Sequence, residues 1–338
     1  MSVNHVYNAI QNSDTIKIKL LLIFEAMMLE RLSVSEFTTH RWSFCQDVVR
    51  YASEGINQIG IWRTKMNDFD RDEAVDLLFE MKMKVSSVHW AGGFTGADGH
   101  KFVDAVDDGI AAVQLAAQVG ADCLIVHPGG QNGHTDRHAR RIFCSAIDNL
   151  AQAAADYGTR IAIEPMPHKY AGPWTFYRRF YEYMDLVSAF DPKHVGLAID
   201  LFHVGHLAEA YDRIPEYVDR LALVQLADRN INQPHVSPSK GRNVENRLIP
   251  GQGHVQIDRW IDKLNRHGYR GAYELEIHGK GFKQSNYRNT IDESLNYLCS
   301  PLRSFNMNRM SEAEMKRRDR RRQKEQQLQP ELNLQSRW

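Results

Sequence analysis

The sequence has no excess of either charge and no long hydrophobic run, and both absences exclude classes of protein. Its 338 residues include 42 Lys and Arg and 42 Asp and Glu, which gives a formal net charge of zero. Binding to nucleic acid or to an anionic membrane needs a basic excess, so we expect neither partner. The one candidate targeting segment, residues 16–29, has an apolar run, Leu20–Phe24, that stops at Glu25, far short of the roughly 20 residues of a membrane span.

Cysteine is also scarce. The four cysteines lie far apart and form no C-x-x-C pair: Cys45, Cys123, Cys144 and Cys299. This spacing fits neither a disulfide framework nor a thiolate zinc site, and it is typical of a protein in a reducing compartment. We therefore expect a cytoplasmic protein.

The two ends of the chain differ in composition from the part between them. We expect residues 1–30 to form an N-terminal extension, residues 31–305 to form one domain, and residues 306–338 to form a charged tail that is flexible or helical. Ser311–Trp338 carries eight Lys and Arg against five Asp and Glu. A basic arm of this kind could contact RNA or an acidic partner, but no aromatic residues are interleaved to stack on bases, which favours a solvated tail.

Between the ends, eight short apolar runs alternate with longer amphipathic stretches. Several runs are almost continuously apolar, which is typical of strands buried on both faces. The eight strand candidates are Leu32–Thr38, Gln58–Trp62, Val85–Trp90, Cys123–His127, Ile161–Glu164, Val195–Asp200, Leu221–Leu226 and Ala272–Ile277.

The stretches between these runs have helical periodicity. One helical face of residues 101–119 carries Val103, Val106, Ile110, Val113 and Ala117. Gly120 is expected to end this helix, and Gly158 to end a second helix over residues 137–157. A last helix near Ile291–Leu298 follows the eighth strand.

Eight strands, each followed by a helix, predict an α/β fold that consists of a single (β/α)8 TIM barrel. Strict alternation requires parallel strands joined by helical crossovers, and eight such units can close on themselves. A doubly wound open sheet is the alternative. No G-x-G-x-x-G turn follows any strand, which excludes the dinucleotide-binding form of that fold.

Polar residues stand at the ends of the last four predicted strands, where the chemistry of such a barrel lies. They are Glu164, Asp200, Gln225 and Glu276, with Glu274 two residues before Glu276. Each alone could cap the next helix or pair with a lysine, but carboxylates that converge on one pocket repel each other and need a cation. No cluster of Lys or Arg stands at the same strand ends, so we predict one divalent metal ion. Oxygen ligands favour Mn²⁺ or Mg²⁺ over Co²⁺ or Zn²⁺.

These segments resemble those of the xylose isomerase-like barrels, a family that includes sugar phosphate isomerases and epimerases, inosose dehydratases, 3-dehydroshikimate dehydratases and endonuclease IV. The resemblance covers roughly Leu32 to Leu298. No single motif is specific, whereas their order around eight strands is. The motifs are IAIEP at 161–165, VGLAIDLFH at 195–203, VQLAD at 224–228, PGQG at 250–253 and GYRGAYELE at 268–276.

The resemblance implies one catalytic divalent ion held by Glu164, Asp200, Gln225 and Glu276. Many epimerases of the family have His at the position of Gln225, so this sequence departs from their pattern, although members that resemble dehydroshikimate dehydratases also have Gln. Glu274 lies on the same face of its strand and could replace Glu276 as a ligand, but the register of the family motif favours Glu276. The resemblance also implies that Glu164 and Glu276 are the acid/base pair, acting from opposite faces of the substrate.

Five further residues near the strand ends are candidates for substrate binding. His203 matches the D-x-x-H pattern of the family, which implies a hydrogen bond to a substrate oxygen, but it could instead cap a helix. His127 and His89 end their strands and could line the pocket or be satisfied barrel histidines. Trp62 could wall the pocket or pack in the core, and Arg229 could anchor a phosphate or a carboxylate.

We expect a metal-dependent isomerase or epimerase of a small sugar or polyol, such as a ketose with or without a phosphate group. It would remove a proton next to a carbonyl that the ion polarises. The same step followed by loss of a β-hydroxyl gives a dehydratase of the inosose or 3-dehydroshikimate type, which Gln225 favours. Neutral charge and Gln225 disfavour DNA repair of the endonuclease IV type, and four intact ligands disfavour a non-catalytic binding barrel. Family members often form dimers or tetramers, so a homo-oligomer is possible.

Overall fold

The computed structural model describes residues 28–67, 69–166, 172–231, 247–279 and 286–299. The chain divides into two compact units, Ala26–Cys299 and a second unit made of Met1–Glu25 and Ser300–Trp338. The second unit lies outside the described residues, and with it most of the predicted N-terminal extension and all of the predicted charged tail.

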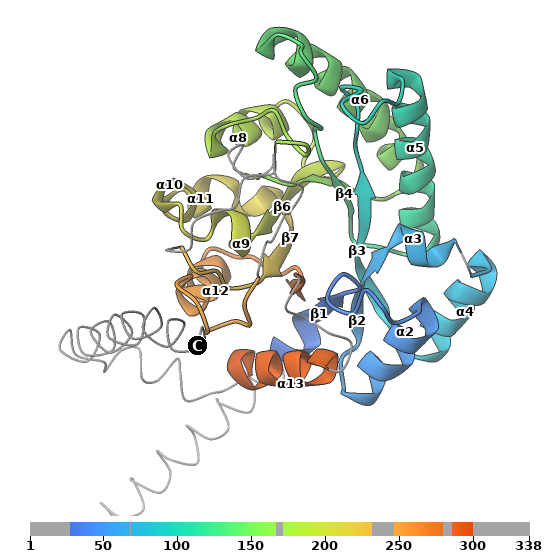
Figure 1. Cartoon of the computed structure of the whole chain (residues 1–338), viewed down its shortest axis with the longest axis vertical. Helices are drawn as coiled ribbons and strands as arrows, with labels where there is room; N and C mark the ends of the chain where they lie inside the picture. The colour runs from blue at the N-terminus through green and yellow to red at the C-terminus, as the bar shows by residue number, and fades with distance from the viewer. Residues whose placement is uncertain (1–27, 68, 167–171, 232–246, 280–285, 300–338) are drawn as a thin grey trace, which may run out of the picture. The chain divides into compact units, whose positions relative to one another are not determined.

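Eight parallel strands close into a barrel in the order of the sequence, and β1 pairs with both β2 and β8 (Figure 1). This closure confirms the predicted (β/α)8 barrel. The strands are β1 (Leu32–Ser35), β2 (Gln58–Trp62), β3 (Lys84–Ala91), β4 (Leu124–Val126), β5 (Ile161–Ile163), β6 (Val195–Asp200), β7 (Leu221–Leu226) and β8 (Tyr273–Leu275). β2, β6 and β7 have the predicted bounds, and the others differ from them by a few residues at the ends.

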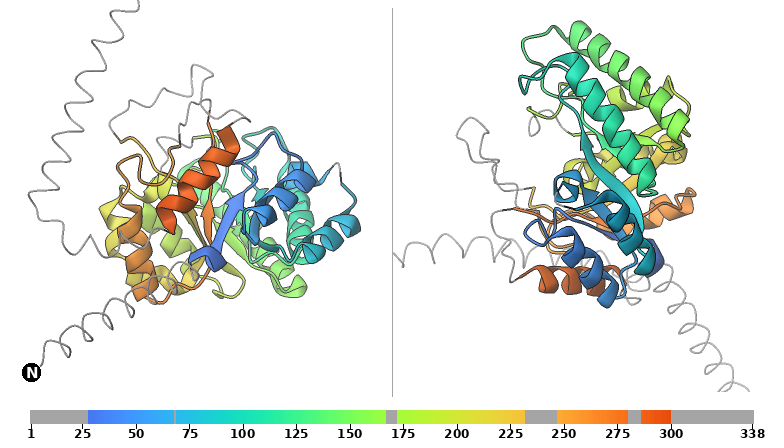
Figure 2. Two further views of the ribbon diagram at one scale, coloured as in Figure 1. Left: turned by 90° about the horizontal axis from the view of Figure 1, so that it is seen from below. Right: turned by 90° about the vertical axis from the view of Figure 1, so that its right-hand side faces the viewer.

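Helices join the strands around the outside of the barrel (Figure 2). They are α2 (Phe44–Ser53), α3 (Arg63–Met66), α4 (Arg71–Glu80), α5 (Phe102–Gln118), α6 (Asp136–Tyr157), α8 (Phe180–Ser188), α9 (Leu201–Val204), α10 (Ala208–Asp212), α11 (Ile214–Tyr217), α12 (Ile257–Arg266) and α13 (Tyr287–Leu298). Ser43 begins α2 in a capping box with Gln46. Gly158, with a φ of 69°, ends α6 as predicted. Among the helices that the structure describes, none has both the length and the apolar character needed to cross a membrane.

The buried face of α5 differs from the prediction. Val103 is 62% exposed. The buried residues of this helix are Ala105, Val106, Gly109, Ala112, Val113, Leu115 and Ala116. α5 packs beside α6 (Figures 1 and 2), and a Cβ at Gly109 would lie 3.1 Å from Leu150 Cδ1. Because small side chains let two helices approach closely, α5 turns its Ala and Gly face toward α6 and leaves Val103 in solvent.

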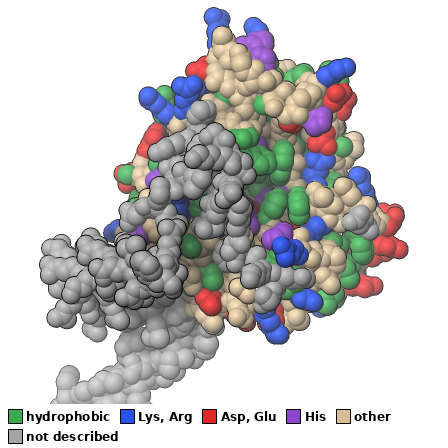
Figure 3. Space-filling view, viewed as in Figure 1, with side chains coloured by type: hydrophobic (Ala, Val, Ile, Leu, Met, Phe, Trp, Pro, Cys, Tyr) green, Lys and Arg blue, Asp and Glu red, His purple; other side chains and the backbone are tan. Residues whose placement is uncertain are grey.

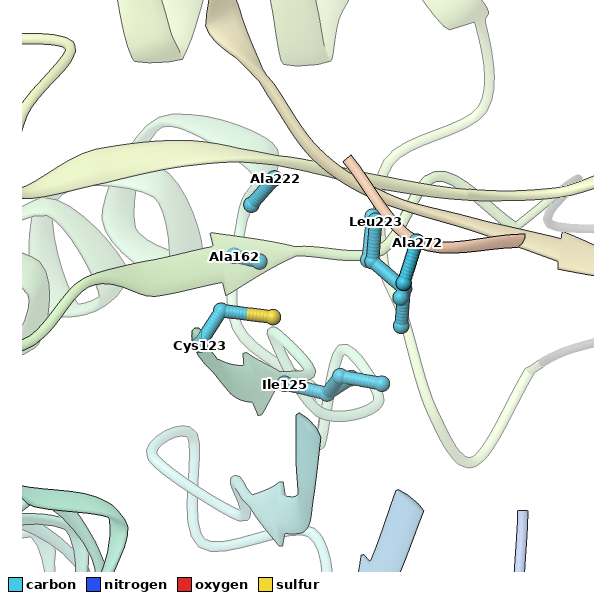
Figure 4. Close-up of a cluster of buried hydrophobic side chains, with 7 residues drawn as sticks. Cys123, Ile125, Ala162, Ala222, Leu223 and Ala272 are labelled. Atoms are coloured by element: carbon cyan, nitrogen blue, oxygen red, sulfur yellow. The ribbon is translucent and has the colours of Figure 1, made fainter. Parts of the chain in front are cut away.

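The buried side chains differ between the two sides of the barrel. The segments from β4 to β8 share a cluster of mostly small apolar residues (Figure 4): Cys123, Ile125, Ala162, Ala198, Ala222, Leu223 and Ala272. On the side of β1 to β3, polar groups are buried along with apolar ones. Ser33 Oγ and Ser86 Oγ lie 2.6 Å apart, and Ser86 donates a hydrogen bond to Glu274 Oε2 at 2.7 Å. The buried Glu274 carboxylate is therefore hydrogen-bonded inside the barrel rather than left among apolar groups.

Gly60 in β2 makes room for this glutamate. A Cβ at position 60 would lie 2.4 Å from Glu274 Oε2 and 2.8 Å from Ser87 Oγ, closer than real Cβ contacts come. Glu274 is fully buried, so its carboxylate cannot move aside into solvent. Position 60 therefore has to lack a side chain for as long as Glu274 stays in place.

We expect Gly60→Ala to lower the free energy of unfolding by about 1–3 kcal/mol, the usual cost of overpacking a well-packed core. Gly172→Ala is the matched control, because a Cβ there meets no atom within 4 Å. Urea unfolding monitored by circular dichroism gives the free energy of unfolding of both variants. An unchanged unfolding midpoint for Gly60→Ala would show that the Glu274 carboxylate does not occupy this space.

Candidate functional site

The predicted ligands lie together at the carboxyl ends of β5 to β8. Asp200, the last residue of β6, pairs in register with Gln225 of β7, and Gln225 Nε2 donates a hydrogen bond to Glu276 Oε2 at 2.5 Å. His203 Nε2 lies 3.8 Å from Glu164 Oε1 and 3.7 Å from Asp200 Oδ2. All five residues are buried. The barrel thus brings the four candidate ligands into one site, with His203 beside them.

Two groups of side chains in this site have the spacing that a metal ion needs. In each group the candidate ligand atoms lie within 4.8 Å of one another: Glu164, Asp200 and His203 in one, and His89, Glu274 and Glu276 in the other. In addition, Gln225 Oε1 is buried without a hydrogen-bond partner, whereas buried polar atoms are normally paired. Carboxylate and amide oxygens are the ligands that a hard divalent cation takes. The donor set therefore fits the predicted ion.

An arginine that the sequence-based prediction did not include also reaches the site. Arg247 Nη1 lies 2.5 Å from Asp200 Oδ2, and its Nη2 lies 3.2 Å from Glu276 Oε1. The expectation that no cluster of Lys or Arg at the strand ends supplies positive charge therefore missed this one arginine. It considered only residues next to the strands in sequence, whereas Arg247 belongs to the long connection between β7 and α12. The available signal was its position three residues before the PGQG motif.

The two carboxylates that share Arg247 differ in acidity. Burial raises the pKa of Asp200 to about 6, and Arg247 offsets this only in part. Burial also raises the pKa of Glu276, but Arg247, together with His278 and His89, outweighs burial and holds that pKa well below its usual range. Glu276 is therefore ionised at neutral pH, and Asp200 takes up a proton first as the pH falls.

Asp228 holds the connection that carries Arg247 against the end of β7. Its carboxylate accepts hydrogen bonds from the backbone N–H groups of Gly251, Gly253 and Val255 at 2.8–3.0 Å. A Cβ at Gly253 would lie 2.3 Å from Asp228 Oδ1, so this position needs glycine. The PGQG motif therefore serves to bring backbone donors close to Asp228, which fixes the loop that follows Arg247.

Two neutral histidines flank Glu164. His127 Nε2 lies 3.6 Å from Glu164 Oε2, and His203 lies on its other oxygen. Burial lowers the pKa of His127 to about 3 and lowers the pKa of His203 well below its ordinary value. His89 differs, because Glu274 and Glu276 outweigh the effect of burial and raise its pKa. At neutral pH, His127 and His203 are thus uncharged groups that can exchange hydrogen bonds with a substrate oxygen.

Aromatic rings stand on two sides of these polar groups. The rings of Trp90, Trp174 and His127 contact one another with centroids 4.8–5.4 Å apart. On another side, the Phe37 ring lies 5.0 Å from that of Trp62 and 5.2 Å from that of His89. Hydrophobic and histidine side chains lie next to each other near the middle of the face in Figure 3.

Arg229, a predicted substrate anchor, is packed against Phe202. It is buried, its guanidinium lies 5.3 Å from the Phe202 ring centroid, and Nη1 donates to the Phe202 carbonyl at 3.3 Å. Phe202 also receives the Arg247 guanidinium, 4.7 Å from its ring. These contacts connect Arg229 to the protein around Asp200, and its predicted role as a substrate anchor stays a prediction.

The barrel and its strand-end residues can be compared with known proteins. A family model described as "Xylose isomerase-like TIM barrel" matches residues 49–300, more than half of the chain. The chain belongs to this family. The matched range includes all four candidate ligands, Arg247 and the loop after β7.

Three similar proteins illustrate the family. An inosose isomerase from Halalkalibacterium halodurans is 21% identical over 156 residues, which are 46% of this chain and 51% of that protein. The chain thus spans about half the length of the curated relatives it matches. A solved protein from Sinorhizobium meliloti has a TM-score of 0.70, 24% identity and coverage of 82% of this chain and 98% of that one. The IOLI protein with a bound zinc atom has a TM-score of 0.66 at 16% identity, with coverage of 80% and 98%.

We expect the folded state to lose stability in acid because of His127. Its pKa is lowered to about 3 in the barrel, whereas an unfolded histidine titrates near pH 6.5, so the unfolded chain binds more protons in between. The free energy of unfolding should therefore fall by up to about 4 kcal/mol as the pH drops from about 6.5 to about 3. His127→Gln should flatten this part of the profile, measured by urea unfolding at a series of pH values. An equally steep profile in the variant would contradict the assignment.

Proposed function

We propose that this protein is a divalent-metal-dependent isomerase or epimerase of a small sugar or polyol, and that it removes a proton next to a carbonyl group. The observation that carries the proposal is the convergence of Glu164, Asp200, Gln225 and Glu276 at one end of the barrel, with the side-chain oxygen of Gln225 unpaired. Membership of the family and the similarity to an inosose isomerase support the reaction class.

The residues that would hold the ion are Glu164, Asp200, Gln225 and Glu276. A divalent ion held there supplies positive charge that polarises a carbonyl and acidifies the adjacent C–H bond. The zinc atom in the similar IOLI structure supports a divalent metal in this protein. Asp200 Oδ2 is now ion-paired with Arg247, so Asp200 would have to share or give up this contact to hold the ion.

Glu164 and Glu276 follow β5 and β8 and are the proposed acid/base pair. Glu276 is ionised at neutral pH, which is the form that a base requires. One glutamate takes the proton from the carbon next to the carbonyl. For inversion, the other glutamate must already carry a proton, which it delivers to the opposite face of the same carbon, and the first glutamate keeps the proton that it took. For isomerisation, the first glutamate delivers its proton to the neighbouring carbon, while the hydroxyl proton moves to the former carbonyl oxygen. His127 and His203 hold substrate oxygens while the proton moves, and the rings of Trp90 and Trp62 limit access of water.

A dehydratase of the inosose or 3-dehydroshikimate type is the second candidate. It shares the first step, after which the electron pair left on carbon forms a C=C bond and expels the β-hydroxyl, which leaves as water with the proton that the glutamate took. Gln225 favours this alternative, because family members that resemble dehydroshikimate dehydratases also have Gln at this position. The identity of the product, rather than that of the first step, separates the two candidates.

We expect purified protein to bind about one divalent ion per chain, held by Glu164, Asp200, Gln225 and Glu276. Asp200→Asn should weaken Mn²⁺ binding at least about tenfold, because it removes a charged ligand. Glu80→Gln on α4 is the control, since this glutamate is exposed. Equilibrium dialysis with Mn²⁺ and elemental analysis measure both quantities. Binding of three ions per chain would favour the nuclease type. A protein that binds no ion would contradict the proposal.

We expect the protein to exchange substrate hydrogen for deuterium in D₂O with Mn²⁺ present, because every proposed outcome begins with proton removal. The panel contains ketoses, inososes and dehydroshikimate, and mass spectrometry also identifies an epimer, an isomer or a dehydrated product. Glu276→Gln should lower the exchange rate by roughly 10²–10⁴-fold, the usual contribution of a general base. Glu80→Gln should leave it unchanged. Equal exchange by Glu276→Gln and the unmodified protein would contradict the acid/base assignment.

A further inference from the structure

The barrel contains a second glutamate on β8 that the proposed reaction does not use. Glu274 precedes Glu276 by two residues, so both side chains project from the same face of the strand. Its exposed fraction is 0%, and Gly60 leaves open the space that its carboxylate occupies. A buried carboxylate is costly unless its oxygens are paired, so its partners indicate what it does.

Both oxygens of Glu274 have partners. Oε2 accepts hydrogen bonds from the hydroxyls of Ser86 and Ser87 at 2.7 and 2.6 Å. Oε1 lies 3.0 Å from His89 Nε2 and accepts a hydrogen bond from Gln225 Nε2, also at 3.0 Å. Each oxygen therefore already faces donors on two sides. This pairing argues against a second metal ion among His89, Glu274 and Glu276, since such an ion would have to displace these donors.

The contact with Gln225 determines which way its amide points. The NH₂ group of Gln225 donates to Glu274 Oε1 at 3.0 Å and to Glu276 Oε2 at 2.5 Å. The reverse orientation would put the amide oxygen against two carboxylate oxygens and leave the amide protons facing away from them. Because the NH₂ end is held by the two glutamates, the carbonyl oxygen is the end left without a hydrogen-bond partner.

We propose that Glu274 is a positioning residue that orients the Gln225 amide so that its oxygen, and not its nitrogen, is presented to the metal ion. The inference rests on the proposed function, because it assumes that Gln225 is a ligand. An amide nitrogen does not coordinate a hard cation, so an amide free to rotate by 180° would be a ligand in only one of its two orientations. A partner that fixes the orientation of a ligand typically changes metal affinity by about 10–100-fold.

The test is a double-mutant cycle on Mn²⁺ affinity, measured by isothermal titration calorimetry with the full chain. Glu274→Gln should weaken binding by about 10–100-fold in the unmodified background. In the Gln225→Ala background, the same change should have a much smaller effect, because no amide is left to orient. If Glu274→Gln costs the same in both backgrounds, Glu274 acts only through its charge and the proposal is wrong.

Glu274→Asp provides a second variant that keeps the charge and shortens the side chain by one methylene. It should weaken Mn²⁺ binding nearly as much as Glu274→Gln, because the carboxylate no longer reaches the amide. Full affinity in Glu274→Asp would overturn the proposal. Thermal unfolding of each metal-free variant verifies that it folds, and a fall in affinity counts only for folded protein.

A measurement without metal separates this inference from the proposed function. The side-chain NH₂ of Gln225, assigned in a ¹⁵N spectrum by its loss in Gln225→Ala, should exchange slowly with solvent in the unmodified protein and at least about tenfold faster in Glu274→Asp, because one of its two hydrogen bonds is lost. If the protein binds no Mn²⁺ but shows this difference, the proposed function fails while the orientation of the amide stands. If exchange is equally fast in both proteins, Glu274 does not orient Gln225.

Discussion

Repulsion between buried carboxylates is the constraint on which this end of the barrel depends. Glu164, Asp200, Glu274 and Glu276 are all buried, so little water is present to screen their charges. Leaving one member of a buried ion pair without its partner typically costs about 3–5 kcal/mol. The neighbouring groups stabilise the carboxylates in different ways. Arg247 supplies a full positive charge to Asp200 and Glu276, whereas a hydroxyl from β3 and an amide from β7 donate hydrogen bonds to Glu274. The shifted pKa values of Asp200 and Glu276 follow from this arrangement.

The closed parallel sheet provides the frame for these contacts. Asp200, Gln225 and Glu274 form one row across β6, β7 and β8 in the register of the strands, so their side chains meet without any contribution from loops. The positive charge comes from a loop instead, and Asp228 holds that loop against β7 through backbone donors. The row of Asp200, Gln225 and Glu274 is thus fixed by the sheet, whereas Arg247 is fixed by the loop. Arg247 supplies the guanidinium that pairs with the row at Asp200, and the loop fixes the position of this arginine.

Sequence alone could predict the fold and the acidic row because both depend on local patterns. Apolar runs at regular intervals indicate strands, and a polar residue at the end of such a run lies at the rim where all parallel strands end. Arg247 could not be placed in this way, because its position depends on a loop that returns to the site through contacts with Asp228. The buried face of α5 was misjudged for a related reason: hydrophobic periodicity gave weight to Val103, whereas close packing against α6 selects the small residues.

If Glu274 orients Gln225 as proposed, glutamine at the end of β7 accounts for the second glutamate at the end of β8. An imidazole carries its ligand nitrogen in a ring whose orientation one hydrogen bond can fix, whereas the two ends of an amide are nearly equal in shape and differ only in their hydrogen bonds. A single carboxylate would hold one amide proton and leave the other without a fixed partner. With Glu274 below Glu276, both protons are held, and the space at Gly60 accommodates the additional carboxylate. On this proposal both glutamates hold the amide, and Glu276 in addition would be a ligand of the ion.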